Sequence, residues 1–288
     1  MHRARLIAIL GMVVSGLLAL MKLTLGWRAH SASVIADGFE SAADVFASGL
    51  VLAGLILADR PPDENHPYGH GRVETLTGLL LGFFLFAAGI LIAWHAITGG
   101  DDHITPARWA VIPLIVSILA KGGLVGVKYR HGRSIGSSSL LADAANDGID
   151  MLSGAVALIA LSITLWRPVE FARADHYGAF AVGLIVMVTA VRVMHEASLH
   201  LMDTMPDDEA MAKIRDAALR VKDVDGVEKC FARKTGLKYH VDLHLEVDPD
   251  ITVRASHEIA QRVRERIREE IPWVADVLVH VEPWPGKN

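Results

Sequence analysis

Oxygen-bearing side chains spaced four residues apart occur twice inside long apolar stretches of this sequence. Glu40 and Asp44 form one pair, and Asn146 and Asp150 form the other. In a helix, residues four apart lie on one face, about 6 Å apart along the axis. Two such helices facing each other would bring three carboxylates so close that they stay ionised only if a cation binds. The spacing therefore predicts a site that exchanges a divalent cation for protons.

Acidic residues inside apolar segments also have a structural interpretation, as helix caps or as partners in internal salt bridges. Intramembrane charges are costly and by default mark an ion or substrate path. In the apolar segments we count two cations, Lys121 and Arg192, which are too few to neutralise all the acids. We therefore favour an ion path for the two pairs. For Asp37, Asp143 and Asp147, a role in positioning helices or lining a water-filled vestibule stays open.

Long apolar stretches must form the helices that position these side chains. The chain of 288 residues is 52% hydrophobic and 21% charged, with a mean hydropathy of +0.35. This composition excludes a purely soluble or a disordered chain. A helix of about 20 apolar residues crosses the hydrocarbon core of a bilayer. Six stretches are long enough, namely Leu6–Trp27, Ser33–Ala58, Leu76–Ile97, Trp109–Val127, Leu140–Trp166 and Gly178–Met194.

The charged residues are concentrated at the end of the chain. Residues 200–288 hold 14 of the 28 Lys and Arg residues and 18 of the 33 Asp and Glu residues. We therefore expect a membrane domain over residues 1–199 and a small α+β domain over residues 200–288. In the second domain, the periodicity predicts helices over Asp207–Val221 and Thr252–Glu270, and strands over Val227–Arg233, Lys238–Val247 and Ala275–Val281.

Charge and cysteine content restrict the partners. The net charge of −5 argues against a nucleic-acid partner. The single cysteine, Cys230, excludes both a disulfide framework and a cysteine-based zinc finger. We expect a lipid bilayer, metal ions and protons as partners instead.

The Lys and Arg residues of the short loops predict the orientation in the membrane, because short cytoplasmic loops contain more Lys and Arg than the loops on the other side. The richer side should be cytoplasmic, which places both termini and the last domain in the cytoplasm of a multi-pass protein of the inner (plasma) membrane. The richer side has seven such residues (Arg3, Arg5, Arg60, Arg72, Lys128, Arg130 and Arg133), and the other side has four (Arg28, Arg108, Arg167 and Arg173).

The loop after the second apolar stretch carries a long motif. Its sequence from Pro61 to Glu74, PPDENHPYGHGRVE, is similar to the P-x-D-x-x-H-P-[FY]-G-H-G-[KR]-x-E signature of the cation diffusion facilitator family, proton-coupled exporters of divalent metals. The resemblance covers nearly the whole chain. Shorter matches are Leu201–Asp203, His244–Glu246, Ser256–Glu258 and Val279–Pro283.

The resemblance implies a fold, an assembly and a transport site. It implies six transmembrane helices, all α, followed by a cytoplasmic α+β ferredoxin-like (metallochaperone-like) domain, and a homodimer. It implies a secondary transporter rather than an enzyme, with no organic cofactor. The family's transport ligands map onto Glu40, Asp44, Asn146 and Asp150.

The ligand set departs from the zinc-exporting pattern, because neither helix carries the histidine that zinc exporters usually have. An all-oxygen set with one amide favours Mn²⁺ or Fe²⁺ over Zn²⁺, which prefers nitrogen and sulfur ligands. The same mechanism with Zn²⁺, Co²⁺, Ni²⁺ or Cd²⁺ stays an alternative. Without a histidine, the exchanged protons would have to bind Glu40, Asp44 or Asp150.

Further candidate sites lie outside the apolar stretches. Asp63, His66 and His70 could bind a metal in the signature loop, with loop packing or a transit site as the alternatives; a helical metalloprotease motif is excluded because Pro67 and Gly69 oppose a helix there. The resemblance implies two more features. These are a cytoplasmic metal cluster at His244, His257, His280 and Glu282, with Cys230 near a further ligand position, and an interlock pair, Arg72 and Asp203, at the dimer interface.

Overall fold

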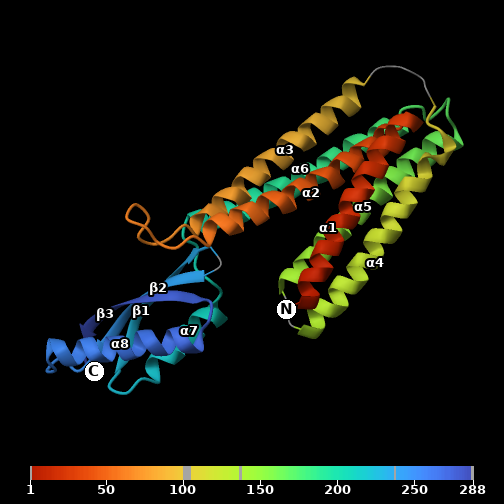
Figure 1. Cartoon of the computed structure of the whole chain (residues 1–288). Helices are drawn as coiled ribbons and strands as arrows, with labels where there is room; N and C mark the ends of the chain where they lie inside the picture. The colour runs from red at the N-terminus through yellow and green to blue at the C-terminus, as the bar shows by residue number, and fades with distance from the viewer. Residues whose placement is uncertain (1, 100–104, 136–137, 237, 287–288) are drawn as a thin grey trace. The chain divides into compact units, whose positions relative to one another are not determined.

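The computed structural model describes residues 2–99, 105–135, 138–236 and 238–286 (Figure 1). The chain divides into two compact units. The first unit comprises Met1–Leu52 and Leu80–Met194, and the second unit comprises Ala53–Leu79 and His195–Asn288. The predicted domain boundary at residues 199 and 200 stays a prediction.

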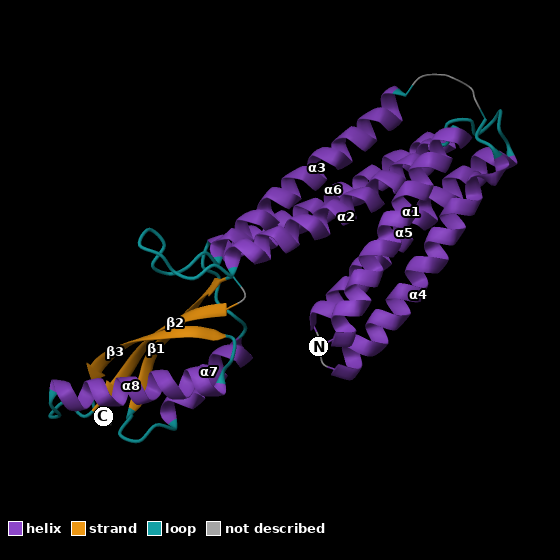
Figure 2. Cartoon of the chain, in the orientation of Figure 1, coloured by secondary structure: helices purple, strands orange, loops and turns teal. Residues whose placement is uncertain are grey.

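Six long helices make up most of the first two thirds of the described chain (Figure 2). Each of them is long and apolar enough to cross a membrane, which confirms the six predicted spans. The helices are α1 (His2–Ala29), α2 (Ala32–Ala58), α3 (Arg72–Thr98), α4 (Val111–Ile135, after a short 3-10 helix at Arg108–Ala110), α5 (Ser138–Trp166) and α6 (Ala174–Leu201).

The fourth helix is longer than the sequence predicts. We expected it to end at Val127 and to be followed by a polar loop over Lys128–Ser137. Instead α4 continues to Ile135, because this segment contains no proline and its first residue, Lys128, is buried among acids of α5. Of the other predicted loops, Gly99–Arg108 lies partly outside the described residues.

A carboxylate on α6 holds the connection between α1 and α2. The Ser31 hydroxyl donates to Asp175 Oδ1 over 3.0 Å, and the Ala32 backbone N–H donates to Oδ2 over 2.6 Å. The Ser33 hydroxyl donates to the same carboxylate. Asp175 is 3% exposed, so it satisfies the free donors at the start of α2 much as a capping residue does.

We expect Asp175→Ala to lower the free energy of unfolding by about 2–4 kcal/mol, because it leaves several buried donors unpaired. Thermal unfolding of the purified chain in detergent, followed by tryptophan fluorescence, measures the change. Glu170→Ala is the matched control: Glu170 forms an exposed pair with Arg167, which contributes about 0–1 kcal/mol. Equal melting temperatures for the two variants would contradict the capping role.

The end of the chain forms a three-stranded sheet with two helices. Strand β1 is antiparallel to β2, and β2 is parallel to β3. The order helix, strand, strand, helix, strand is that of a ferredoxin-like fold without its first strand, which confirms the expected class. The elements are α7 (Asp208–Leu219), β1 (Gly226–Thr235), β2 (Lys238–Val247), α8 (Val253–Glu270) and β3 (Val274–Pro283).

The core of this domain lies between the sheet and its helices. On β2, Val241, Leu243 and Leu245 are completely buried, and they pack with Val263 and Ile267 of α8 in one apolar cluster. The intervening residues of β2 are less buried, as the predicted alternation requires. The polar side chains of β2, including its histidines, therefore lie on the face of the sheet away from this core.

Candidate functional site

Helices α2 and α5 bring three of the four predicted transport ligands together in the first unit. Glu40 and Asp150 are 7% and 9% exposed, and the carboxyl group of Asp44 lies near enough to that of Asp150 for the two to interact electrostatically. The Ser153 hydroxyl, one turn beyond Asp150, donates to Glu40 Oε1 over 2.7 Å. The i, i+4 spacing on α2 and the packing of α5 together create this cluster.

Two oxygens of the cluster lack a partner. Glu40 Oε2 and Asp44 Oδ2 are buried and have no hydrogen-bond partner among the described residues. A buried polar oxygen without a partner costs free energy, and structures rarely leave one in that state. Coordination of a cation would satisfy both oxygens, so the cluster has the character of a metal site.

The fourth predicted ligand is placed differently. Asn146 lies one turn before Asp150 on α5, but Asn146 is exposed whereas Asp150 is buried. Helix α5 therefore buries one of these two residues and exposes the other, although they lie one turn apart. The role of Asn146 as a ligand stays a prediction.

Buried lysines lie beside these acids, and two of them, Lys22 and Lys128, were not counted as membrane cations above. Lys22 of α1 is 1% exposed, and its ammonium lies 2.7 Å from Asp37 of α2. Our count of Lys121 and Arg192 as the membrane cations was therefore wrong: Lys22 belongs to the first apolar stretch, and Lys128 was assigned to a loop. For Asp37 the salt-bridge interpretation is the one that the structure supports.

Helices α4 and α5 share a continuous row of ion pairs. Lys128 Nζ lies 2.8 Å from Asp143 and 2.5 Å from Asp147. Lys121 Nζ lies 2.8 Å from Asp147 Oδ1 and also contacts Asp150. The row Asp143, Lys128, Asp147, Lys121 and Asp150 thus ends at the acidic cluster, and its last member is a predicted transport ligand.

The signature loop gathers a second group of metal-ligating atoms, in the second unit. The ligand atoms of Asp63, His66 and His70 all lie within 4.8 Å of one another. His66 Nδ1 is 3.0 Å and His70 Nε2 is 3.4 Å from the Asp63 carboxylate. The backbone N–H of His66, and then its imidazole, lower the pKa of Asp63, which keeps this carboxylate ionised. Two imidazoles and a carboxylate are suitable ligands for Zn²⁺ and similar ions.

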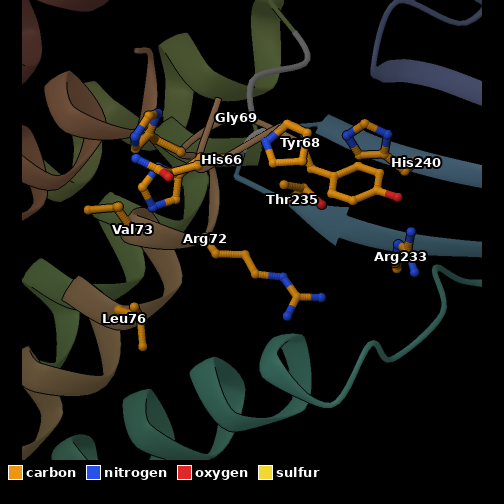
Figure 3. A pocket seen from close by; sticks show the side chains of 12 residues that line it. His66, Tyr68, Gly69, Arg72, Val73, Leu76, Arg233, Thr235 and His240 are labelled. Carbon is orange, nitrogen blue, oxygen red and sulfur yellow. The ribbon is translucent and has the colours of Figure 1, made fainter. Parts of the chain in front are cut away.

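The same loop packs against the sheet of the second unit around a pocket (Figure 3). The Tyr68 ring meets His240 of β2 edge to face with centroids 6.1 Å apart, and the Arg233 guanidinium lies 5.8 Å from the Tyr68 centroid. Gly71 comes so close to the turn between β1 and β2 that a Cβ there would lie 2.8 Å from the Thr235 carbonyl. Sequence reasoning missed these contacts, since they join residues far apart in the chain.

We expect Gly71→Ala to release the signature loop from the sheet, because the added methyl group would overlap the Thr235 backbone. Hydrogen–deuterium exchange should then rise over residues 60–71. Gly49→Ala is the control, since a Cβ at Gly49 meets nothing within 4 Å. Unchanged exchange in the loop of Gly71→Ala would contradict the close packing.

A third group lies on the exposed face of the sheet. Strands β2 and β3 run parallel with His244 beside His280, so alternate residues project on the same side. His244 Nδ1 lies 2.5 Å and His280 Nε2 lies 3.6 Å from Glu282 Oε1, and the three ligand atoms lie within 4.8 Å of one another. Hydrogen bonds with Glu228 and His244 lower the pKa of Glu282. The structure thus brings three of the four predicted tail ligands together.

Two other candidate ligands lie apart from this group. His257 is exposed on α8, where its Nε2 lies 3.4 Å from the Gln261 amide nitrogen. Cys230 is 2% exposed and belongs to the apolar core of the domain. Burial raises the pKa of this thiol to about 11, so Cys230 is a neutral core residue rather than a ready metal ligand.

The predicted interlock pair forms within the chain. Arg72, at the start of α3, donates to Asp203 Oδ1 over 2.9 Å, and the two side chains are 53% and 42% exposed. Both residues belong to the second unit. An exposed pair contributes little to stability by itself, so its role at a dimer interface stays a prediction.

Family comparisons cover nearly the whole chain. A model described as "Cation efflux transmembrane domain" matches residues 8–202. A model described as "Cation efflux protein, cytoplasmic domain" matches residues 206–284.

Curated relatives match along most of this chain. "Uncharacterized transporter YdbO" from Bacillus subtilis is 33% identical over 96% of this chain and 94% of that protein. "Manganese efflux system protein MneS" from Bacillus subtilis is 30% identical over 94% of this chain and 92% of that protein. "Metal tolerance protein C1" from Arabidopsis thaliana is 31% identical over 95% of this chain, which spans 61% of that protein's length.

Proposed function

The chain belongs to the cation efflux family of multi-pass membrane transporters, and on this premise we propose that it exports a divalent metal ion from the cytoplasm in exchange for protons. The observation that carries the proposal is the cluster of buried Glu40 and Asp150 with partly buried Asp44, in which two carboxylate oxygens lack a partner among the described residues. For the protein as a whole we propose no catalytic residues and no organic cofactor.

The excess of acid in the membrane supports exchange of a cation for protons. The described membrane helices bury Lys22, Lys121 and Lys128, which pair with Asp37, Asp143, Asp147 and Asp150. Among the described residues no lysine contacts Glu40 or Asp44, and Asp150 shares Lys121 with Asp147. A bound divalent ion would balance most of this charge. When the ion leaves, protons on the same carboxyls would keep the site from remaining highly charged.

The ligand chemistry favours Mn²⁺ or Fe²⁺ as the substrate. Among the described residues the cluster offers oxygen atoms only, and hard oxygen ligands suit these ions better than Zn²⁺. Two related proteins of Bacillus subtilis are named manganese efflux system proteins. Transport of Zn²⁺, Co²⁺, Ni²⁺ or Cd²⁺ by the same mechanism is the alternative, and relative transport rates would distinguish the two.

The assembly belongs to the same proposal. We propose a homodimer in the inner membrane with both termini in the cytoplasm, in which the tail domains pair and the group of His244, His280 and Glu282 binds regulatory metal. The match of residues 206–284 to a cytoplasmic domain of cation efflux proteins supports this orientation. Metal bound at the tail would balance part of its acidic charge and favour pairing of two copies.

Uptake into proteoliposomes tests the function. The purified chain is reconstituted, a pH gradient is imposed, and entry of Mn²⁺, Fe²⁺ or Zn²⁺ is followed in parallel. The proposal predicts faster uptake of Mn²⁺ or Fe²⁺ than of Zn²⁺ and loss of uptake when the gradient is collapsed. Absence of uptake of every metal would overturn it.

Substituting the amide tests the ligand-hardness argument. We expect Asn146→His to raise the ratio of Zn²⁺ to Mn²⁺ transport by about tenfold, because an imidazole is a better ligand for Zn²⁺ than an amide is. Asn146→Gln, which keeps the amide, should leave the ratio close to that of the parent. An unchanged ratio in Asn146→His would remove Asn146 from the ligand set.

A further inference from the structure

We propose that Lys121 is a tethered counter-cation of the transport site: it pairs with Asp150 when the site is free of metal and withdraws to Asp147 when a divalent ion binds. The inference deepens the proposed function and rests on it, since it takes Asp150 to be a ligand of the transported ion.

The position of Lys121 supports the first half of this inference. Its side chain is 3% exposed, and its ammonium contacts both Asp147 and Asp150 of α5. The two acids are three residues apart and therefore lie on one face of the helix. The ammonium is thus placed between two carboxylates, one of which belongs to the acidic cluster.

The partners of the two acids differ. Asp147 has a second cation, because Lys128 Nζ lies 2.5 Å from its other oxygen. For Asp150, Lys121 is the lysine in contact among the described residues. Lys128 in turn contacts Asp143, whose side chain is 43% exposed. The row of charges therefore runs from the cluster to a more exposed position, with Lys121 as the lysine nearest the cluster.

Electrostatics supports the second half. A divalent ion bound by Asp150 would lie within a few ångströms of the Lys121 ammonium, and at such distances like charges repel strongly in a medium of low dielectric constant. The ammonium cannot enter the apolar part of the bundle without a partner, because a buried unpaired charge is very costly. Asp147, already 2.8 Å away, gives it an ion pair in both states, so a small side-chain movement suffices.

This arrangement has a kinetic consequence. The lysine competes with the metal for Asp150, so it lowers the affinity of the site. It also favours release, because its return to Asp150 replaces part of the charge that the departing ion takes away. Such a site binds the metal less tightly and turns over faster than the same carboxylates would without the lysine.

A purely structural role for Lys121 predicts something different. If the lysine only fastened α4 to α5, loss of either Lys121 or Asp147 would loosen the same contact and harm metal binding in the same direction. A counter-cation predicts opposite changes, since Lys121→Met removes the competitor whereas Asp147→Asn removes its alternative partner. The sign of the two changes therefore separates the two roles.

The experiment measures initial rates of Mn²⁺ uptake into proteoliposomes as a function of Mn²⁺ concentration. For Lys121→Met we expect the KM to fall by about tenfold or more and the maximal rate to fall as well. For Asp147→Asn we expect the KM to rise. In the double variant, Asp147→Asn should add little to Lys121→Met, because the two substitutions act through one interaction. Lys121→Arg should stay close to the parent.

Lys22→Met is the matched control. It removes an equally buried ammonium from the bundle, but that ammonium pairs with Asp37, which is not a proposed ligand, so the KM should change much less than in Lys121→Met. Size-exclusion profiles and melting temperatures verify that each variant folds. If Lys121→Met does not fold, Lys121→Gln replaces it in the test. Asp147→Asn should then raise the KM in the parent but not in the Lys121→Gln background.

The outcomes separate this inference from the function on which it rests. If the parent transports no divalent ion, or if Asp150→Asn transports as the parent does, the proposed site is wrong and the inference falls with it. If the parent transports and Asp150→Asn does not, but Lys121→Met and Asp147→Asn shift the KM in the same direction or not at all, the inference alone is overturned.

Discussion

Asp150→Asn is expected to reduce the rate of Mn²⁺ transport by at least about 100-fold while the chain remains folded. Asp150 is 9% exposed and its carboxylate contacts the Lys121 ammonium beside Glu40 and Asp44, so little solvent screens its interaction with a bound ion. An amide of the same size keeps the shape of the site but loses that charge. Removing a charged partner from a buried ion costs about 3–5 kcal/mol, which is enough for the predicted loss. Initial rates in proteoliposomes measure the effect.

Asp143→Asn is the matched control for this prediction. It removes a carboxylate from the same helix, two turns earlier, where the side chain is 43% exposed and pairs with Lys128. A half-exposed pair outside the cluster contributes little, so we expect transport within about threefold of the parent. If Asp143→Asn lost as much transport as Asp150→Asn, the row of ion pairs, and not the cluster, would control transport.

His244→Ala is expected to lower the metal affinity of the tail domain by at least about tenfold. His244 is the central residue of the third group, because its imidazole lies 2.5 Å from Glu282 and its ring centroid is 5.1 Å from that of His280. Loss of one of three ligands leaves too few protein atoms to hold a divalent ion tightly. Calorimetric titration of the full chain with Zn²⁺ and with Mn²⁺ measures the affinity, in a background in which Asp44→Ala and His66→Ala silence the other two candidate sites.

His240→Ala is the control for the tail. His240 lies on the same strand, four residues earlier, but its ring contacts Tyr68 instead of the metal-ligating group. Its loss should leave the metal affinity of the tail unchanged, and an equal fall for both variants would place the site elsewhere on the sheet.

His257→Ala adds information about assembly. Since α8 holds His257 apart from the group within one chain, a fall in affinity would mean that a second copy supplies this ligand.

Much of the fold could be predicted from the sequence because local pattern determines it. The six membrane helices follow from apolar length alone. Strand β2 follows from strict alternation, and Leu243 and Leu245 are buried as that alternation requires. The approach of Glu40 and Asp44 also has a local origin, since residues four apart share a helix face.

The parts that the sequence did not predict depend on contacts between helices. Lys128 looks like a loop residue, and only the acids of α5 explain why it is buried. Asn146 and Asp150 have the same spacing as the pair on α2, yet one is exposed and the other buried, because the packing of neighbouring helices decides which part of a face points inward. The contact between Gly71 and Thr235 joins distant segments, so no local pattern reveals it.

Metal-driven proton movement tests the central claim most directly. The chain is reconstituted into liposomes that contain a pH-sensitive dye, and Mn²⁺ is added outside without an imposed gradient. The account predicts that the pH inside rises as Mn²⁺ enters and protons leave, and that Asp150→Asn liposomes show no change. Entry of Mn²⁺ without a change in internal pH, or a rise in Asp150→Asn equal to that of the parent, would contradict it.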